Sequence, residues 1–150
     1  MENTASHIKI GKTGEDIAVK HLVKHKYKIL ERNYRKKWGE IDIIAESFDK
    51  TQNKKILHFI EVKSVSHETD FDNYLPEENV HRFKRKRLER TINTYLAEKK
   101  FFTPSNDGAH ETQNDNDREL EFQVDIIAVY FNPATKQSRI RVLENIILGD

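Results

Sequence analysis

Two stretches of the chain decide its fold: Gly39-Glu40-Ile41-Asp42-Ile43-Ile44-Ala45 and Ile56-Leu57-His58-Phe59-Ile60-Glu61-Val62-Lys63-Ser64-Val65. Both are rich in β-branched residues, and a polar, turn-like segment at 47–55 separates them. We therefore predict two strands that pair as an antiparallel hairpin. Because side chains alternate along a strand, the first strand is expected to place Glu40, Asp42 and Ile44 on one face and Ile41, Ile43 and Ala45 on the other.

Three charged residues interrupt these apolar strands. Glu61 and Lys63 are two residues apart, so their side chains leave the same face. Taken alone, such a pair is most often the solvated half of an amphipathic strand. The predicted hairpin, however, brings Asp42 close to Glu61, and carboxylate oxygens are the ligands that Mg²⁺ and Mn²⁺ prefer. We predict a metal site at Asp42 and Glu61, with Lys63 orienting the nucleophile or stabilising the transition state.

A helix is predicted at about residues 14–25, with Thr13 as its N-cap. Ala18 and Leu22 form its inner stripe, and Glu15 continues that stripe at a position where an apolar residue is expected. Glu15 can therefore complete the shell of the metal. The alternative, which the residues leave open, is a carboxylate that stabilises the positive end of the helix dipole.

The remaining predicted elements are a strand at 27–34, a long helix after Pro76 that ends around Lys100, and strands at 122–131 and 139–143. The segment at about 103–119 is almost wholly polar and is predicted to be a surface loop or insertion. The expected order is helix, three strands, helix and two strands. A chain of 150 residues fits a single domain spanning 1–150.

The composition of the chain excludes several kinds of functional site and favours one cellular compartment. The absence of cysteine excludes disulfides, thiolate metal sites and cysteine nucleophiles, and favours the cytoplasm. Residues 1–10 lack the apolar core of a signal peptide, and no stretch approaches the roughly 20 apolar residues of a membrane span, so no membrane partner is expected. Lys and Arg number 26 against 25 Asp and Glu, so only the distribution of charge can indicate a polyanionic partner.

Basic residues gather in two places. The second long helix contains Arg82, Lys84, Arg85, Lys86, Arg87 and Arg90, with few acids to balance them. A solvated helix face is the usual explanation of such a run, but contact with a nucleic-acid backbone fits it as well. Arg32, Arg35, Lys36, Lys37 and Trp38 precede Asp42 and can add phosphate contacts and a stacking surface, although Trp38 is equally an ordinary packing residue. The predicted nucleic-acid contacts are Arg32, Arg35, Lys84, Arg85 and Arg87.

The order of several motifs resembles the YraN-like bacterial family. The motifs are Gly14-Glu15, Arg32-Asn33-Tyr34-Arg35, Gly39-Glu40-Ile41-Asp42, Glu61-Val62-Lys63, the segment 80–88 with Lys84 inside it, and Val124-Asp125. That family is placed in the PD-(D/E)xK superfamily and is similar in pattern to archaeal Holliday-junction resolvases. The resemblance covers nearly the whole chain apart from about 106–117. It implies an α/β, restriction-endonuclease-like core, a central mixed β-sheet flanked by helices.

The resemblance also implies roles for particular residues. Glu15, Asp42, Glu61 and Lys63 fall on the acidic and lysine positions of the superfamily. The chain departs from the family at Val65, where an Arg is usual, and at Gln123-Val124-Asp125, which replaces Arg-Phe-Asp. We expect a Mg²⁺-dependent (or Mn²⁺-dependent) endonuclease that cleaves DNA, with branched DNA as one candidate substrate. The alternative is a non-catalytic nucleic-acid-binding protein that retains the fold. The sequence leaves undecided whether the chain forms a homodimer that cuts two strands.

Overall fold

The computed structural model describes residues 2–65, 67–73, 82–99 and 121–146, with side chains described except at 2–8, 69–70 and 82–84. The elements, in chain order, are α1 (Glu2–Lys24), β1 (Lys28–Lys36), β2 (Gly39–Asp49), β3 (Lys54–Val65), α2 (Glu68–Asp72), α4 (Arg82–Glu98), β4 (Glu121–Phe131) and β5 (Ser138–Leu143). The predicted order is confirmed, and the short α2 is an addition to it. The polar loop predicted at 103–119 lies outside the described residues.

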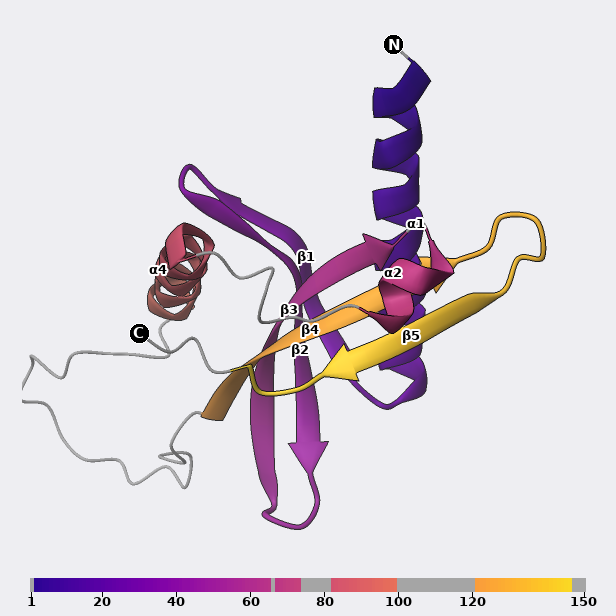
Figure 1. The fold of residues 1–150 in the computed structure, drawn as a ribbon. Coiled ribbons are helices and arrows are strands. Elements are labelled where there is room, and N and C mark those ends of the chain that lie inside the picture. Colours follow the sequence, from indigo (N-terminus) through magenta and orange to yellow (C-terminus); the bar gives the residue numbers. More distant parts are fainter. Residues whose placement is uncertain (1, 66, 74–81, 100–120, 147–150) are drawn as a thin grey trace, which may run out of the picture.

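The strands form one five-stranded sheet in the order β1-β2-β3-β4-β5 (Figure 1). β3 and β4 are parallel, whereas the other three neighbouring pairs are antiparallel. The long connection between β3 and β4 permits the parallel pairing, because parallel strands need a crossover. This mixed sheet with its flanking helices bears out the predicted α/β fold and is consistent with a restriction-endonuclease-like core. None of the described helices is long and apolar enough to cross a membrane.

A separate hydrophobic core lies on each face of the sheet. On one face, Ala18 and Leu22 of α1 pack with strand residues that include Ile43, Ile60 and Ile127. On the other face, α4 packs against a second set of strand residues, and that core contains Ile41, Ile44, Leu57, Phe59, Ile92, Tyr95 and Leu96. The alternation of side chains along β3, with neighbouring residues in different cores, produces this division. α1 and α4 therefore cover opposite faces (Figure 1).

One predicted face assignment in β2 is wrong. Ile41 packs with Ile44 in the core beneath α4, instead of lying with Ile43 and Ala45 on the α1 face. The alternation of side chains is thus interrupted at Asp42. The pairing of β2 with β3 also ends here, at Ile43 opposite Ile60. The two strands diverge at the residues that follow, which are Asp42 and Glu61.

Two predicted boundaries also need correction. α1 begins at Glu2 instead of Gly14, and Thr13 is not an N-cap, because its hydroxyl donates to the carbonyl of Lys9 inside the helix at 2.9 Å. The amphipathic stripe marks only the part of α1 that packs on the sheet, and the helix continues beyond it (Figure 1). The segment 47–55 is mostly strand. Pairing between β2 and β3 continues to Asp49 opposite Lys54 and overrides the polar composition, which leaves a turn only at 50–53.

Candidate active site

The site begins where β2 and β3 diverge. Asp42 lies next to Ile43, the last residue of β2 that pairs with β3, and its Oδ2 accepts a hydrogen bond from the backbone N–H of Val62 at 2.8 Å. The carboxylate thus satisfies a strand N–H at the point where the ladder ends, since a buried N–H without an acceptor is unfavourable. Asp42 is held beside Val62, the residue between Glu61 and Lys63, by this contact.

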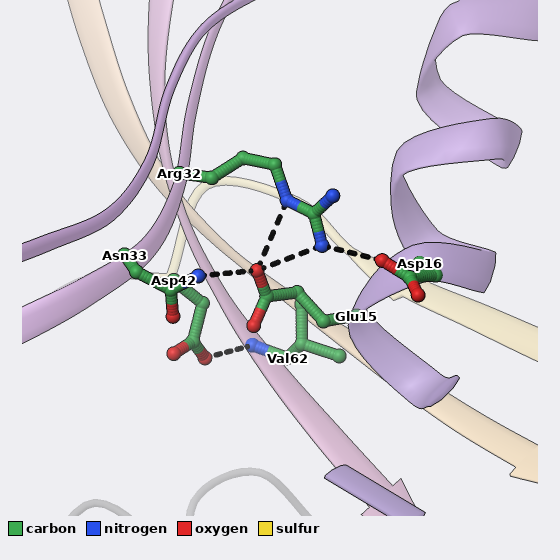
Figure 2. Close-up of polar contacts among 6 residues, drawn as sticks. All are labelled: Glu15, Asp16, Arg32, Asn33, Asp42 and Val62. Carbon is green, nitrogen blue, oxygen red and sulfur yellow. Dashed lines mark hydrogen bonds and ion pairs between the residues drawn. The ribbon is translucent and has the colours of Figure 1, made fainter. Parts of the chain in front are cut away.

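Glu15 reaches the same place from α1 because the helix lies unusually close to β3. A Cβ at Gly14 would lie 1.9 Å from Ser64 Oγ and 3.1 Å from Ser64 Cβ, so glycine permits this approach without a shift of the helix or of the Ser64 side chain. The next residue, Glu15, is directed toward the diverging strands, and only 13% of its side chain is exposed. Figure 2 shows its carboxylate near that of Asp42. The structure therefore places Glu15 on the buried side of α1, as its position in the apolar stripe predicted.

Two residues of β1 hold Glu15 in position (Figure 2). Arg32 donates from Nε to Glu15 Oε1 at 3.1 Å and from Nη2 to Asp16 at 2.6 Å. Asn33 Nδ2 donates to the same oxygen of Glu15 at 2.9 Å. The backbone of Asn33 is left-handed, with φ 53°, a conformation that asparagine tolerates better than most residues. The Arg-Asn dipeptide of the family motif is thus a clamp on Glu15.

The carboxylates influence the protonation of Asp42. Burial is the largest cause of a raised pKa at Asp42, which reaches about 6. The hydrogen bond from Val62 opposes the shift, while neighbouring carboxylates add to it: Glu61, Glu15 and Glu40. The neighbouring carboxylates make ionisation of Asp42 less favourable. A cation bound among them would offset this repulsion.

Two hollows meet at Asp42. The α1-side hollow, of about 900 Å³, is lined by residues of α1, β1, β2 and β3, among them Glu15 and Arg32. The α4-side hollow, of about 750 Å³, is lined by the turn between β1 and β2 together with β2, β3 and α4, among them Trp38, Glu61 and Arg87. Asp42 and Lys63 line both hollows. The exposed Lys63 is therefore accessible to a molecule that occupies either one.

The residues present fit a hard divalent cation. Asp42, Glu61 and Glu15 offer only oxygen donors, which Mg²⁺ and Mn²⁺ prefer, and Mg²⁺ commonly takes one or two carboxylates with waters completing its shell. The acidic and histidine side chains of the described part of the chain nevertheless form no group of three already in metal-binding proximity. These carboxylates therefore suit a metal ion that takes one or two protein ligands and completes its shell with water.

The predicted nucleic-acid contacts lie in different environments. Arg32 is committed to Glu15 and Asp16, and the exposed Arg35 pairs with Glu40 at 2.9 Å on the rim of the α1-side hollow. Arg87 is exposed and lines the α4-side hollow, and Arg85 is half-buried. The side chain of Lys84 lies outside the described residues. Arg87 and Arg35 thus have the most suitable positions.

Comparison with known proteins places the chain in a family. The model of the uncharacterised protein family UPF0102 matches residues 14–129, which include the four candidate site residues. The chain belongs to UPF0102. It is 36% identical over 140 residues to a UPF0102 protein of Campylobacter hominis, covering 93% of this chain and 95% of that protein. It is also 34% identical to one of Flavobacterium johnsoniae, covering 85% and 86% of the two chains, and 40% identical to one of Thermotoga maritima, covering 63% and 77%.

Membership of UPF0102 confirms the predicted resemblance to the YraN-like family. The motifs quoted for that resemblance now have positions in this UPF0102 protein. Gly14 allows α1 to approach β3, Asn33 clamps Glu15, and Asp42 closes the end of the β2–β3 ladder. The description of the family assigns no activity.

Sequence reasoning missed a buried polar network in this UPF0102 protein. His58 Nδ1 lies 2.6 Å from Asp125 Oδ2, and His58 Nε2 lies 2.7 Å from Ser47 Oγ. Asp125 also accepts hydrogen bonds from the side chain of Gln123 and from the backbone N–H of Asn145. The network joins β2, β3 and β4 to the segment after β5. Two signals were available: His58 is the single polar residue among His58, Ile60 and Val62 of one strand face, and Asp125 is a lone carboxylate in an apolar strand.

Proposed function

We propose that this UPF0102 protein is a metal-dependent endonuclease that cleaves phosphodiester bonds of DNA with Mg²⁺ or Mn²⁺ held by Asp42 and Glu61, and that Glu15 moves in to complete the shell when the metal binds. The observation that supports this most is the position of Asp42. Its carboxylate is fixed by Val62 N–H at the divergence of two strands, with its pKa raised toward 6 by burial and neighbouring carboxylates, and Lys63 lines the same hollows.

Each protein group has a defined task in this proposal. When bound, the metal ion would lower the pKa of water and offset negative charge on the phosphate. Lys63 presents a cationic donor beside the scissile phosphate and stabilises charge that develops there. Arg32 and Asn33 keep the carboxylate of Glu15 oriented. Arg35 and Arg87, on the rims of the two hollows, contact flanking phosphates.

The second candidate function is nucleic-acid binding without catalysis. Val65 favours it, because this residue takes the position of the usual family arginine and is buried in an apolar cluster with Phe71 and Ala128. Residue 65 therefore cannot supply the cationic contact to a phosphate that an arginine at this position would offer. The candidate is consistent with the same basic surfaces but requires no metal.

Calorimetric titration with Mn²⁺ and cleavage of a labelled panel of branched, linear and single-stranded DNA test the proposal together. The parent is expected to bind Mn²⁺ and cleave at least one substrate, whereas the Asp42→Asn, Glu61→Gln double variant should lose both properties. Glu89→Gln, which removes an exposed carboxylate from α4, is the matched control. Unchanged metal affinity in the double variant would show that the site is misassigned. DNA binding by the parent without cleavage under any metal would favour the second candidate.

A further inference from the structure

We propose that the α4-side hollow binds an unpaired stretch of nucleic acid, whose base stacks on Trp38 and whose phosphates contact Lys37 and Arg87. This inference rests on the proposed function and specifies its substrate: DNA that contains unpaired nucleotides beside the scissile bond, in preference to an uninterrupted duplex.

The wall of the hollow that carries Trp38 is fixed against α4. Trp38 lies in the turn between β1 and β2, and the next residue, Gly39, packs closely on the helix. A Cβ at Gly39 would lie 2.7 Å from Thr91 Oγ1 and 3.4 Å from the carbonyl oxygen of Arg87. Thr91 is fully buried and donates to that same carbonyl at 2.7 Å. The binding surface is thus already formed before any ligand arrives, which lowers the entropic cost of binding.

Trp38 lines this wall, and the guanidinium group of Arg90, which lines a neighbouring hollow on α4, holds its ring in place. The guanidinium carbon of Arg90 lies 4.1 Å from the centroid of the Trp38 ring, and Arg90 is exposed. Bases stack both on aromatic rings and on guanidinium planes. Within the described part of the chain, Trp38 Nε1 is buried and has no hydrogen-bond acceptor.

Charge around the hollow suits a phosphate chain. The cationic side chains that line it are Lys37, Lys63 and Arg87, and Arg90 stands on Trp38 beside them. The carboxylates that line it are Glu40, Asp42 and Glu61. Glu40 is already paired with Arg35 at 2.9 Å. Three cations and three carboxylates thus line the hollow, and the carboxylates Asp42 and Glu61 are adjacent to the proposed metal position, which leaves the cations Lys37 and Arg87 for phosphates.

The size of the hollow favours an unpaired strand. Its volume of about 750 Å³ is in the range of sites that enclose small ligands and is suited to one or two nucleotides. The bases of a duplex are stacked between two backbones, so a paired base reaches an enclosed site only after it is extruded, at an energetic cost that is smallest for bases already unpaired. Single strands present their bases and phosphates together, and proteins bind them with a positive groove and aromatic side chains.

Fluorescence offers a direct test, because Trp38 is the single tryptophan of the chain. We expect a 12-nucleotide oligothymidylate to quench Trp38 emission in EDTA, where no metal-dependent cleavage occurs. A duplex of equal length is expected to require at least tenfold higher concentration for the same quenching. Equal potency of the duplex and the single strand, or no quenching by the single strand, would overturn the inference.

Variants separate stacking from folding, with binding measured by anisotropy of a labelled oligothymidylate. Trp38→Phe retains a ring and should bind within about threefold of the parent, whereas Trp38→Leu should lose roughly tenfold, the scale of one lost stack. Arg87→Ala should also weaken binding, and Lys50→Ala, in the exposed turn at the other end of β2, should not. Parental affinity of Trp38→Leu would contradict the inference. Because these measurements require no cleavage, they succeed or fail independently of the nuclease activity.

Discussion

Asp42 binds a proton more readily in the folded protein than in the unfolded chain, because burial raises its pKa to about 6. Between about pH 4 and pH 6 the folded state therefore holds more protons, and the free energy of unfolding falls as pH rises through this window. Above the window the ionised carboxylate is a constant destabilising contribution in the metal-free protein. This cost is consistent with a residue retained for chemistry.

Replacement of Asp42 by asparagine gives a prediction with a definite sign. Asparagine still accepts the hydrogen bond from Val62 but cannot ionise, so metal-free Asp42→Asn should exceed the parent in stability by roughly 1–2 kcal/mol at pH 8. The difference should disappear near pH 4. Urea unfolding in EDTA at the two pH values measures it. A variant less stable than the parent at pH 8 would indicate that the carboxylate has a structural partner.

At the scale of elements, the contact between α1 and β3 positions Glu15. Gly14→Ala introduces a methyl group 1.9 Å from Ser64 Oγ and 3.1 Å from Ser64 Cβ, so the Ser64 hydroxyl must rotate away and the helix must shift by a few tenths of an ångström from the strand. We expect this variant to lose stability and to weaken Mn²⁺ binding, and the additional change Ser64→Gly should restore part of both. Melting curves and calorimetry provide the measurements.

Gly11→Ala is the matched control for this prediction. Gly11 lies in the same helix, and no atom is within 4 Å of a Cβ placed there. The substitution should therefore stabilise the protein by up to about 1 kcal/mol, because alanine is the better helix former. Equal effects of the two glycine substitutions would show that helix propensity, and not the approach of α1 to β3, explains them.

The sequence predicted those elements in which periodicity carries the information. The apolar stripe of Ala18 and Leu22 located the packed half of α1 and the inward position of Glu15, and strand alternation located Glu61 and Lys63 on one face. Periodicity does not report the extension of α1 before Thr13, in which the side chains described, at 9–12, are exposed. It also did not predict the interruption at Asp42, because that change follows from the divergence of β2 and β3 and the hydrogen bond from Val62.

The sequence also did not predict contacts between residues that are far apart along the chain. His58 and Asp125 meet only because β3 and β4 are parallel in a register that places His58 opposite Gln123. Arg32 illustrates the same limit, since the local run of basic residues suggested a phosphate contact. In the folded chain α1 brings Glu15 and Asp16 to its guanidinium. Charge patterns in one segment do not reveal such a partner from another.

At the scale of the whole molecule, the sheet separates two surfaces that meet at one point. The net charge of +1 conceals this arrangement, because the carboxylates lie where the strands diverge and the cations lie on the turn between β1 and β2 and on α4. Helices on opposite faces each complete one hollow, and Asp42 and Lys63 are shared by both. A substrate in the α4-side hollow and Glu15 in the α1-side hollow are therefore both adjacent to Asp42 and Lys63.

Single-turnover cleavage by Lys63→Ala tests the proposed active site most directly. The variant should bind Mn²⁺ and labelled DNA as the parent does and lose no more than about 1 kcal/mol of stability. Its cleavage rate should fall roughly a hundredfold or more, the scale of losing one electrostatic stabiliser. Lys50→Ala removes the same charge from an exposed turn and should cleave normally. Cleavage by Lys63→Ala at the parental rate would contradict the assignment of the site.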